Sequence, residues 1–433
     1  MQVDPHGYRA RVVDGQVERY LRLFGAVVIE GTKWCGKTWT SRHHAQSITF
    51  VDRGSNLDIA LADPAALLVG ERPHVIDEWQ RAPELWNVVR HAVDDLDGEK
   101  GAWILTGSST PLRDASRHSG AGRFGRIKML PMSLCESGAS DGSVSLAGLF
   151  RGEFSPVACD MSLDSLLAEV VGGGWPESLG LPPDDAAIIP REYIRAVLEE
   201  SVPNANRSGE TARRLLNSLA RNLGQSATYK TLARDMYGED AVRTGDSGTA
   251  ISTQTVAEYL ELLKSMYLIE EVRGWEPPAR SPKRLQTKPK RYFADPSLAV
   301  AALGMGARSL TEDWQTLGLV FENLCMRDLM VYARALPDVG FEPLRYYRDD
   351  SGLEVDAIIE MADGRWAALE IKLSEDKVPQ GVASLQRLRR KLVERPGART
   401  RPPEFMAVVV GIGGHAYQAA EGISVIPIST LGA

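Results

Sequence analysis

Eight consecutive residues near the start of the chain have the types and spacing of a phosphate-binding loop. They read GTKWCGKT from Gly31 to Thr38 and fit the pattern G-x-x-x-x-G-K-[ST]. The glycines let the backbone fold round an anion, Lys37 can reach the β- and γ-phosphates of a nucleotide, and the Thr38 hydroxyl can hold Mg²⁺. An apolar run at residues 25–30 precedes the loop and a helical pattern follows it, so that helix N–H groups would point at the phosphate.

This pattern predicts a P-loop that binds ATP and Mg²⁺. Lys37 would also act on the transferred phosphate and is therefore the first candidate catalytic residue. The residues expected to contact the nucleotide are Gly31, Thr32, Lys33, Trp34, Cys35, Gly36, Lys37 and Thr38.

A second motif, HVIDE at residues 74–78, is an apolar strand that ends in two acids. Asp77 would hold the water shell of Mg²⁺, and Glu78 would orient and deprotonate the attacking water, as in a Walker B motif. Strands that end in a solvated acidic turn are common, but the P-loop upstream favours the hydrolytic interpretation.

Two further groups of polar residues follow the strand predicted at residues 102–105. Ser108 or Ser109 can contact the γ-phosphate or the attacking water, and can equally cap the next helix. Arg123 or Arg126 can neutralise charge on the γ-phosphate, either in its own subunit or in a neighbour's within a homo-oligomer. A flexible basic loop explains the arginines equally well.

The C-terminal part contains a candidate hairpin whose register brings polar residues together. A three-residue loop at 362–364, with its glycine in the left-handed conformation, is a common hairpin connection. In that register Asp356 faces Glu370. Glu354 faces Lys372 on the same side of the hairpin. A two-residue turn would shift the register by one residue and scatter these side chains.

Directly opposed carboxylates repel each other unless a cation lies between them. Asp356 and Glu370 therefore predict a divalent metal site, to which Glu322 could add a ligand from a predicted helix. Lys372 could position a water or stabilise phosphorane charge, so these residues are a candidate metal-dependent phosphodiesterase site. The alternative is a solvent-facing hairpin held by ion pairs, including one between Glu370 and Arg365.

The elements that must position these residues give an α/β fold. Strands at residues 25–30, 48–52, 74–78 and 102–105 alternate with helices, which predicts a parallel sheet covered on both faces. One strand–helix unit separates the P-loop from Asp77, which is typical of the branch of P-loop ATPases that includes the AAA-plus proteins. We expect a P-loop ATPase domain at residues 1–155, a mainly helical region at 156–304 and an α/β nuclease-like domain at 305–433.

The middle region carries two weaker signals for nucleic acid. Helices near residues 227–236 and 252–268 precede a strand at 269–272, as in a winged helix, which would place Thr253–Thr255 at the start of the reading helix. A helical module that only packs two domains together explains the pattern better. Residues 280–291 carry six basic residues and no acid, and can contact phosphates or form a solvated loop.

The composition sets broad limits on the protein. The chain has 433 residues and a net charge of −7, which argues against indiscriminate coating of nucleic acid. Its four cysteines have neither zinc-ligand nor disulfide spacing, and no apolar run is long enough to cross a bilayer. Residues 1–5 do not resemble a signal peptide, so we expect a cytoplasmic protein without a membrane partner.

Four short segments resemble a large prokaryotic family of predicted AAA-type ATPases. The segments are IDEWQ at 76–80, LTGSS at 105–109, AGR at 121–123 and LPMS at 130–133. Members of that family carry a C-terminal domain of unassigned function that is similar to the PD-(D/E)xK restriction-endonuclease fold. The resemblance covers nearly the whole chain and implies ATP binding, although Trp79 stands where the family usually has an aliphatic residue.

Together these features predict an ATPase whose nucleotide cycle controls a nuclease-like domain that engages DNA or RNA. The alternative is an ATP-driven switch or assembly factor, in which a degenerate nuclease fold binds a partner.

Overall fold

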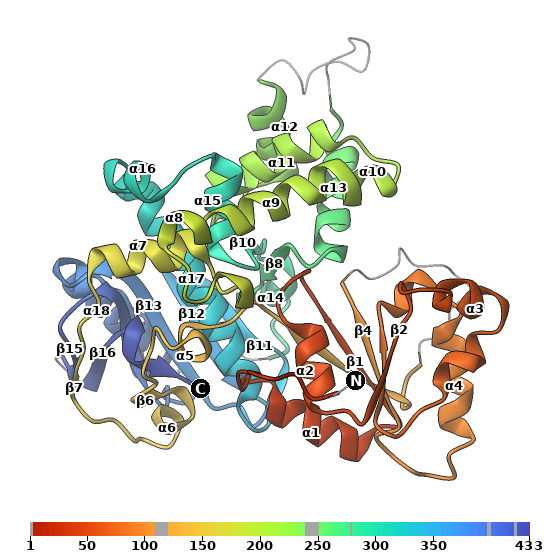
Figure 1. Cartoon of the computed structure of the whole chain (residues 1–433). Coiled ribbons are helices and arrows are strands. Elements are labelled where there is room, and N and C mark those ends of the chain that lie inside the picture. Colours follow the sequence, from red (N-terminus) through yellow and green to blue (C-terminus); the bar gives the residue numbers. More distant parts are fainter. Residues whose placement is uncertain (1–2, 109–119, 239–250, 278, 396–399, 420–421) are drawn as a thin grey trace. The chain divides into compact units, whose positions relative to one another are not determined.

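The computed structural model describes residues 3–108, 120–238, 251–277, 279–395, 400–419 and 422–433. The chain divides into two compact units (Figure 1). The first consists of residues 1–131 with 263–268, and the second of residues 132–262 with 269–433. The candidate Ser109 lies outside the described residues.

The described part of the first unit contains a five-stranded parallel sheet in the order β2-β3-β4-β1-β5. This confirms the parallel sheet that the sequence predicts. The strands are β1 (Ala26–Gly31), β2 (Ser47–Phe50), β3 (His74–Asp77), β4 (Trp103–Gly107) and β5 (Phe124–Met129). The helices are α1 (Asp14–Leu23), α2 (Lys37–His43), α3 (Asn56–Ala62) and α4 (Leu85–Asp94).

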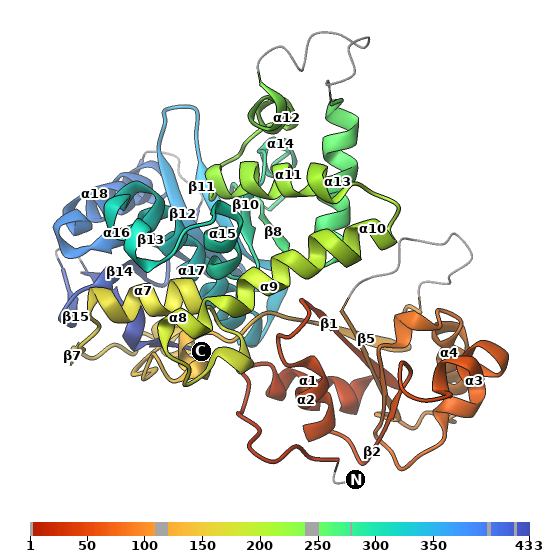
Figure 2. The ribbon, with the colours of Figure 1, turned by 45° about the horizontal axis from the view of Figure 1, so that its top comes forward.

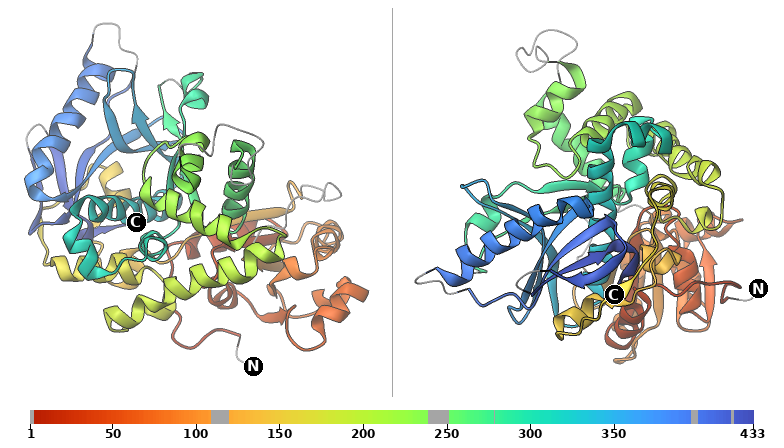
Figure 3. Two further views of the ribbon diagram at one scale, coloured as in Figure 1. Left: turned by 90° about the horizontal axis from the view of Figure 1, so that it is seen from above. Right: turned by 90° about the vertical axis from the view of Figure 1, so that its left-hand side faces the viewer.

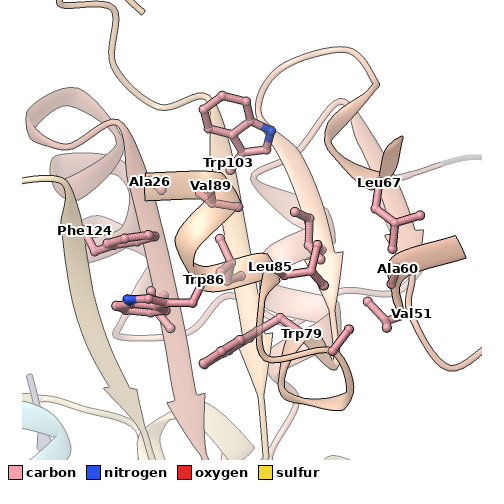
Figure 4. Close-up of a cluster of buried hydrophobic side chains, with 14 of the residues drawn as sticks. Ala26, Val51, Ala60, Leu67, Trp79, Leu85, Trp86, Val89, Trp103 and Phe124 are labelled. Atoms are coloured by element: carbon pink, nitrogen blue, oxygen red, sulfur yellow. The ribbon is translucent and has the colours of Figure 1, made fainter. Parts of the chain in front are cut away.

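Both faces of this sheet are buried. Successive side chains of a strand point to opposite sides of the sheet, and those of β1 enter two different apolar clusters. Ala26 and Val28 of β1 belong to one apolar cluster, whereas Val27 and Ile29 belong to the other. The first cluster is shown in Figure 4, where Trp86 of α4 stacks on Phe124 of β5 with ring centroids 4.1 Å apart. The P-loop and the acids of β3 lie at the carboxyl ends of the strands of this buried sheet.

The helical part of the second unit is built round the short apolar helix α15 (Pro296–Leu303). This helix packs on α7 (Leu163–Gly172), α9 (Ile188–Ala196), α11 (Gly209–Arg221) and α17 (Trp314–Ala335) (Figure 2). Its antiparallel strands β8 (Ile269–Val272) and β10 (Lys290–Phe293) form a separate pair. The helices are α5 (Leu134–Ser137), α6 (Leu146–Phe150), α7 (Leu163–Gly172), α8 (Pro183–Ala186), α9 (Ile188–Ala196), α10 (Val202–Asn204), α11 (Gly209–Arg221), α12 (Tyr229–Tyr237), α13 (Thr253–Ser265), α14 (Lys283–Gln286), α15 (Pro296–Leu303), α16 (Ala307–Glu312) and α17 (Trp314–Ala335).

The predicted helical pair before residue 269 is present as α12 and α13, and the strand after it as β8. The winged-helix assignment and a role of Thr253–Thr255 in reading bases stay predictions. None of the helices in the described ranges combines the length and the apolar character that crossing a membrane requires.

The described part of the second unit also contains an eight-stranded mixed sheet, in the order β7-β15-β16-β14-β13-β12-β11-β9. Its strands are β7 (Val157–Ala158), β9 (Gly274–Trp275), β11 (Val339–Arg348), β12 (Glu354–Met361), β13 (Trp366–Ser374), β14 (Met406–Ile412), β15 (His415–Gln418) and β16 (Ile423–Pro427).

Different helices cover the two faces of β14 (Figure 3). Val408 and Val410 share an apolar cluster with Leu385 of α18 (Val378–Arg389). A Cβ added at Gly411, on the opposite face, would meet Phe321 of α17 at 3.0 Å. The sheet is thus enclosed between helices.

Residues 132–155, which the sequence assigns to the first domain, pack within the second unit. The backbone N–H of Leu134 donates to Asp328 of α17 at 3.0 Å, and β6 (Val144–Ser145) pairs with β17 (Leu431–Gly432) at the end of the chain. Apart from residues 263–268, the predicted middle and C-terminal domains both fall in this unit, and their separation at residue 304 stays a prediction.

Candidate functional site

The P-loop links β1 to α2 in a conformation that requires glycine at two positions. Gly36 caps α2 with φ 101°, in the left-handed region that favours glycine. Gly31 lies against β5, and a Cβ there would be only 2.1 Å from the carbonyl oxygen of Met129. The loop is therefore held close to the sheet, with the start of α2 directly behind it.

Lys37 and Thr38 face the inside of this loop and the neighbouring strand. The Lys37 ammonium donates to the carbonyls of Gly31 at 3.0 Å and Thr32 at 2.6 Å, and the side chain is buried. The Thr38 hydroxyl donates to Asp77 Oδ1 at 3.0 Å. The structure thus brings the P-loop and the first acid of β3 into direct contact.

Asp77 is a buried carboxylate with several hydrogen-bond donors round it. Burial raises the pKa of Asp77 above its usual value. Hydrogen bonds from the hydroxyls of Thr106 and Thr38 lower this pKa but only partly offset the effect of burial. The side-chain oxygens of Thr38 and Asp77 are the type of metal ligand that Mg²⁺ prefers. The buried Thr32 hydroxyl has no hydrogen-bond partner in the described residues. The residues present therefore fit a magnesium–nucleotide complex.

Glu78 follows Asp77 at a sharp change of backbone direction, with φ 57° in the left-handed region. The Ser108 hydroxyl donates to Glu78 Oε2 at 3.3 Å, and the Gln80 amide donates to the same oxygen. The same amide lies 3.5 Å from Ser108 Oγ. Sequence reasoning missed Gln80, although the IDEWQ segment contains it.

The two candidate arginines lie at different distances from the P-loop along β5, and each pairs with an acid. Arg123 pairs with Asp94 at 2.7 Å, at the start of β5, and β5 runs parallel to β1 with Phe124 beside Ala26. The P-loop begins five residues further along β1, roughly 16 Å away at the rise of a strand. A role of Arg123 at the nucleotide of its own subunit would therefore need a different arrangement from this one, and it stays a prediction.

Arg126 lies further along β5 and pairs with the residue that directly precedes the P-loop. Its guanidinium pairs with Glu30 at 3.1 Å and lies over the ring of Trp86 at 4.7 Å. Action of either arginine on a neighbouring subunit stays a prediction.

The predicted hairpin of the second unit has the predicted register from its loop to the pair Ala357–Leu369, whereas Glu354, predicted to face Lys372, contacts Lys290. Gly364 is left-handed with φ 84°, and the Met361 N–H donates to the Arg365 carbonyl at 2.8 Å. The ladder pairs Ala357 with Leu369, so the next positions are Asp356 and Glu370. There the strands part, and Asp356 Oδ2 accepts the Ile371 N–H at 2.9 Å.

Lys372 and Lys290 supply the positive charge that these carboxylates require. Lys372 Nζ lies 2.5 Å from Glu370 Oε2 and 3.5 Å from Asp356 Oδ2. Lys290 of β10 lies 3.8 Å from Asp356 Oδ1 and contacts Glu322 of α17. Sequence reasoning placed Lys290 only in the basic segment before residue 291, with no signal for this position. We call Lys290, Glu322, Glu354, Asp356, Glu370 and Lys372 the acidic cluster.

Burial and mutual repulsion shift the pKa values of several residues in the acidic cluster. Burial, with the neighbouring Asp356 carboxylate, raises the pKa of Glu322 to about 7 and that of Glu370 to about 8. Burial lowers the pKa of Lys290, but the surrounding carboxylates outweigh that effect and raise it. Glu370 Oε1 is buried and accepts no hydrogen bond from the described residues.

The carboxylates are suitable in type for a hard divalent cation. As they lie, however, no three or more His, Cys, Asp and Glu side chains in the described ranges could hold a metal ion. The cation between the opposed carboxylates is lysine. Metal binding by Asp356 and Glu370 therefore stays a prediction and requires that an ammonium group moves.

Three family models match successive parts of the chain. Residues 24–137 match a model described as AAA domain, in agreement with the parallel sheet and the P-loop. Residues 164–309 match the Domain of unknown function DUF8612, and residues 317–431 match the Domain of unknown function DUF4143. The first unit therefore contains a P-loop ATPase-type domain, and the predicted nuclease likeness of the last segment is not established by its family.

Solved structures of other proteins are also similar to this chain. The Walker-type ATPase PABY2304 of Pyrococcus abyssi is similar with 15% sequence identity and a TM-score of 0.43, over 69% of this chain and 99% of that chain. No protein with a curated description matches the chain.

Proposed function

We propose that the protein binds and hydrolyses ATP at the P-loop. The observation that carries this proposal is the hydrogen bond from Thr38 to Asp77, which joins the phosphate-binding loop to the acidic end of β3. The AAA-domain match of residues 24–137 supports it.

Each residue of the site has a separate task in this reaction. Lys37, which now donates to two loop carbonyls, would turn its ammonium to the β- and γ-phosphates. Glu78 would accept the proton of the attacking water, held in orientation by Gln80 and Ser108. Thr38 and Asp77 would hold Mg²⁺, which supplies positive charge beside the phosphates when it is bound.

Replacement of Lys37 by alanine tests nucleotide binding. Loss of a charge-assisted contact to phosphate should weaken ATP affinity by on the order of 100-fold. Calorimetric titration of ATP with Mg²⁺ into the full-length protein gives the affinity. Lys100→Ala, an exposed lysine outside the site, is the matched control and should bind as the parent does. Equal affinity in Lys37→Ala would contradict the proposed phosphate contact.

We propose a second activity for the acidic cluster, namely metal-dependent cleavage of DNA or RNA under control of the nucleotide cycle. The convergence of Asp356, Glu370 and Lys372, with Glu322 contributed by α17, supports it. Asp356 and Glu370 would hold the divalent cation. Lys372 would stabilise charge on the phosphate or position the water.

Cleavage of single- and double-stranded DNA and RNA with Mg²⁺ or Mn²⁺, with and without ATP, tests this second activity. Asp356→Asn should lower cleavage by at least about 100-fold because it removes a metal ligand, while ATP hydrolysis continues. Asp350→Asn is the control, since that side chain is 98% exposed. If the parent protein cuts no nucleic acid with either metal, the second unit is instead the partner-binding part of an ATP-driven switch.

A further inference from the structure

Lys290 is a buried lysine whose ammonium group lies among three carboxylates. Its side chain is 4% exposed, and Nζ lies 2.6 Å from Glu354 Oε1 and 3.5 Å from Glu322 Oε1. The third carboxylate, Asp356, is 3.8 Å away and also contacts Lys372. Lys290 thus lies within 4 Å of three carboxylates of the acidic cluster, whereas Lys372 lies within 4 Å of two.

This lysine comes from a different part of the chain than the carboxylates. Lys290 opens β10, inside the DUF8612 segment, whereas Glu322 and the β12–β13 hairpin belong to the DUF4143 segment. The acidic cluster is therefore assembled by the packing of β10 onto α17. A movement of β10 would withdraw one cation from three acids without breaking the hairpin.

The contacts of β10 explain how Lys290 is held in place. The Tyr292 hydroxyl donates to Glu322 Oε1 at 2.6 Å. The backbone of Phe293 exchanges two hydrogen bonds with the Asn323 side chain, at 2.9 and 2.8 Å. Lys290 itself lies over the Tyr346 ring at 5.3 Å. These bonds fix the strand directly beside the acid that Lys290 neutralises.

Two cations at one site exclude each other. A divalent ion bound to Asp356 would come within a few ångströms of the Lys290 ammonium, and the repulsion between them is strong where water is excluded. Removal of Lys290 would leave Glu322, Glu354 and Asp356 without that counter-ion, which favours uptake of another cation.

We propose that Lys290 determines the affinity of the acidic cluster for divalent cations by occupying the cation position itself. A metal ion binds Asp356 more tightly when the Lys290 ammonium is withdrawn or removed, because among the described residues only the Lys372 ammonium then competes for that carboxylate. The inference rests on the second proposed function in that it concerns the same carboxylates. It differs in assigning the control of metal binding to a strand outside the hairpin.

Titration of Mn²⁺ into the full-length protein without nucleotide tests this inference. Lys290→Met, which keeps an unbranched side chain one atom shorter and removes its charge, should bind Mn²⁺ more tightly than the parent by on the order of tenfold or more. The added binding should disappear in the double variant Lys290→Met with Asp356→Asn, which separates it from metal bound at the P-loop. Lys288→Met, two residues away and exposed, is the matched control and should match the parent.

Thermal unfolding gives an independent readout. Lys290→Met should unfold at a lower temperature than the parent without metal, and Mn²⁺ should raise its midpoint by more than it raises the parent's. Lys290→Gln, which can still donate to Glu354, serves if the methionine variant does not fold. A role of Lys290 only as a structural counter-ion predicts the lower midpoint but no gain in Mn²⁺ affinity, and that result would overturn the inference.

The two proposals fail in different ways. Equal Mn²⁺ affinity in parent and Lys290→Met overturns the control by Lys290, and nucleic-acid cleavage by the parent would then leave the phosphodiesterase proposal standing. Tighter Mn²⁺ binding by Lys290→Met without cleavage of any nucleic acid supports the control by Lys290 and removes the phosphodiesterase.

Discussion

Glu78→Gln is expected to lower the rate of ATP hydrolysis by about 10²–10⁴-fold, the range that a general base contributes. Glutamine cannot take a proton from water. It keeps the shape of the side chain and can still accept the hydrogen bond that Ser108 now donates to Glu78 at 3.3 Å. The metal-binding pair of Thr38 and Asp77 is untouched, so ATP affinity should stay within about twofold of the parent.

Phosphate release under saturating ATP, combined with a separate binding titration, distinguishes this result from a loss of affinity. Glu84→Gln is the control, because Glu84 is an exposed acid before α4 and lies outside the site. Turnover that is unchanged in Glu78→Gln would remove Glu78 from the mechanism. A matching loss of ATP affinity would instead indicate a binding role.

The P-loop site was predictable because its residues lie in two short segments whose spacing carries the geometry. Gly36 must be left-handed to start α2, and parallel strands place the ends of β1 and β3 at one edge of the sheet. Contact between Thr38 and Asp77 follows from those two facts. Gln80 was missed because its orientation depends on the turn after Glu78, which no periodicity describes.

The hairpin register was predictable for a similar reason. One left-handed glycine, Gly364, sets the loop, and the loop sets which residues face each other. The argument from charge repulsion predicted a cation between the carboxylates and assigned it to a divalent metal, whose binding stays a prediction. Asp356 and Glu370 do have a cation beside them, and it is the ammonium group of Lys372, with that of Lys290 on the far side of Asp356.

Lys290 could not be predicted because its position depends on packing between distant segments. Along the chain it is one of several basic residues before Arg291, and its neighbours give no period that would bury it. Only the docking of β10 on α17, through Asn323 and Tyr292, turns it toward the acids. The placement of Arg123 and of residues 132–155 was missed for the same reason, since partners such as Asp94 and Asp328 are far away in sequence.

Arg327→Met is expected to lower the free energy of unfolding of the second unit by about 3–5 kcal/mol, as removal of one partner from a buried ion network does. Arg327 is 1% exposed and pairs with Asp295 at 2.8 Å and with Asp328 at 2.7 Å, both of which are fully buried. The variant would leave two carboxylates without their counter-ion. Their remaining donors carry no full charge: they include the backbone N–H groups of Gly174, Ser297 and Leu134 and the hydroxyls of Ser297 and Tyr332.

Denaturant unfolding followed by far-ultraviolet circular dichroism measures this loss, with Arg308→Met as control, because the Arg308 side chain is 95% exposed. The triple variant Arg327→Met, Asp295→Asn, Asp328→Asn should recover part of the stability, since it removes the buried charges together with their partner. A loss below about 1 kcal/mol in Arg327→Met would mean that water or a shift of α17 relieves the two acids. The ion network would then contribute little to the stability with which α15, α17 and the segment at residues 132–174 pack together.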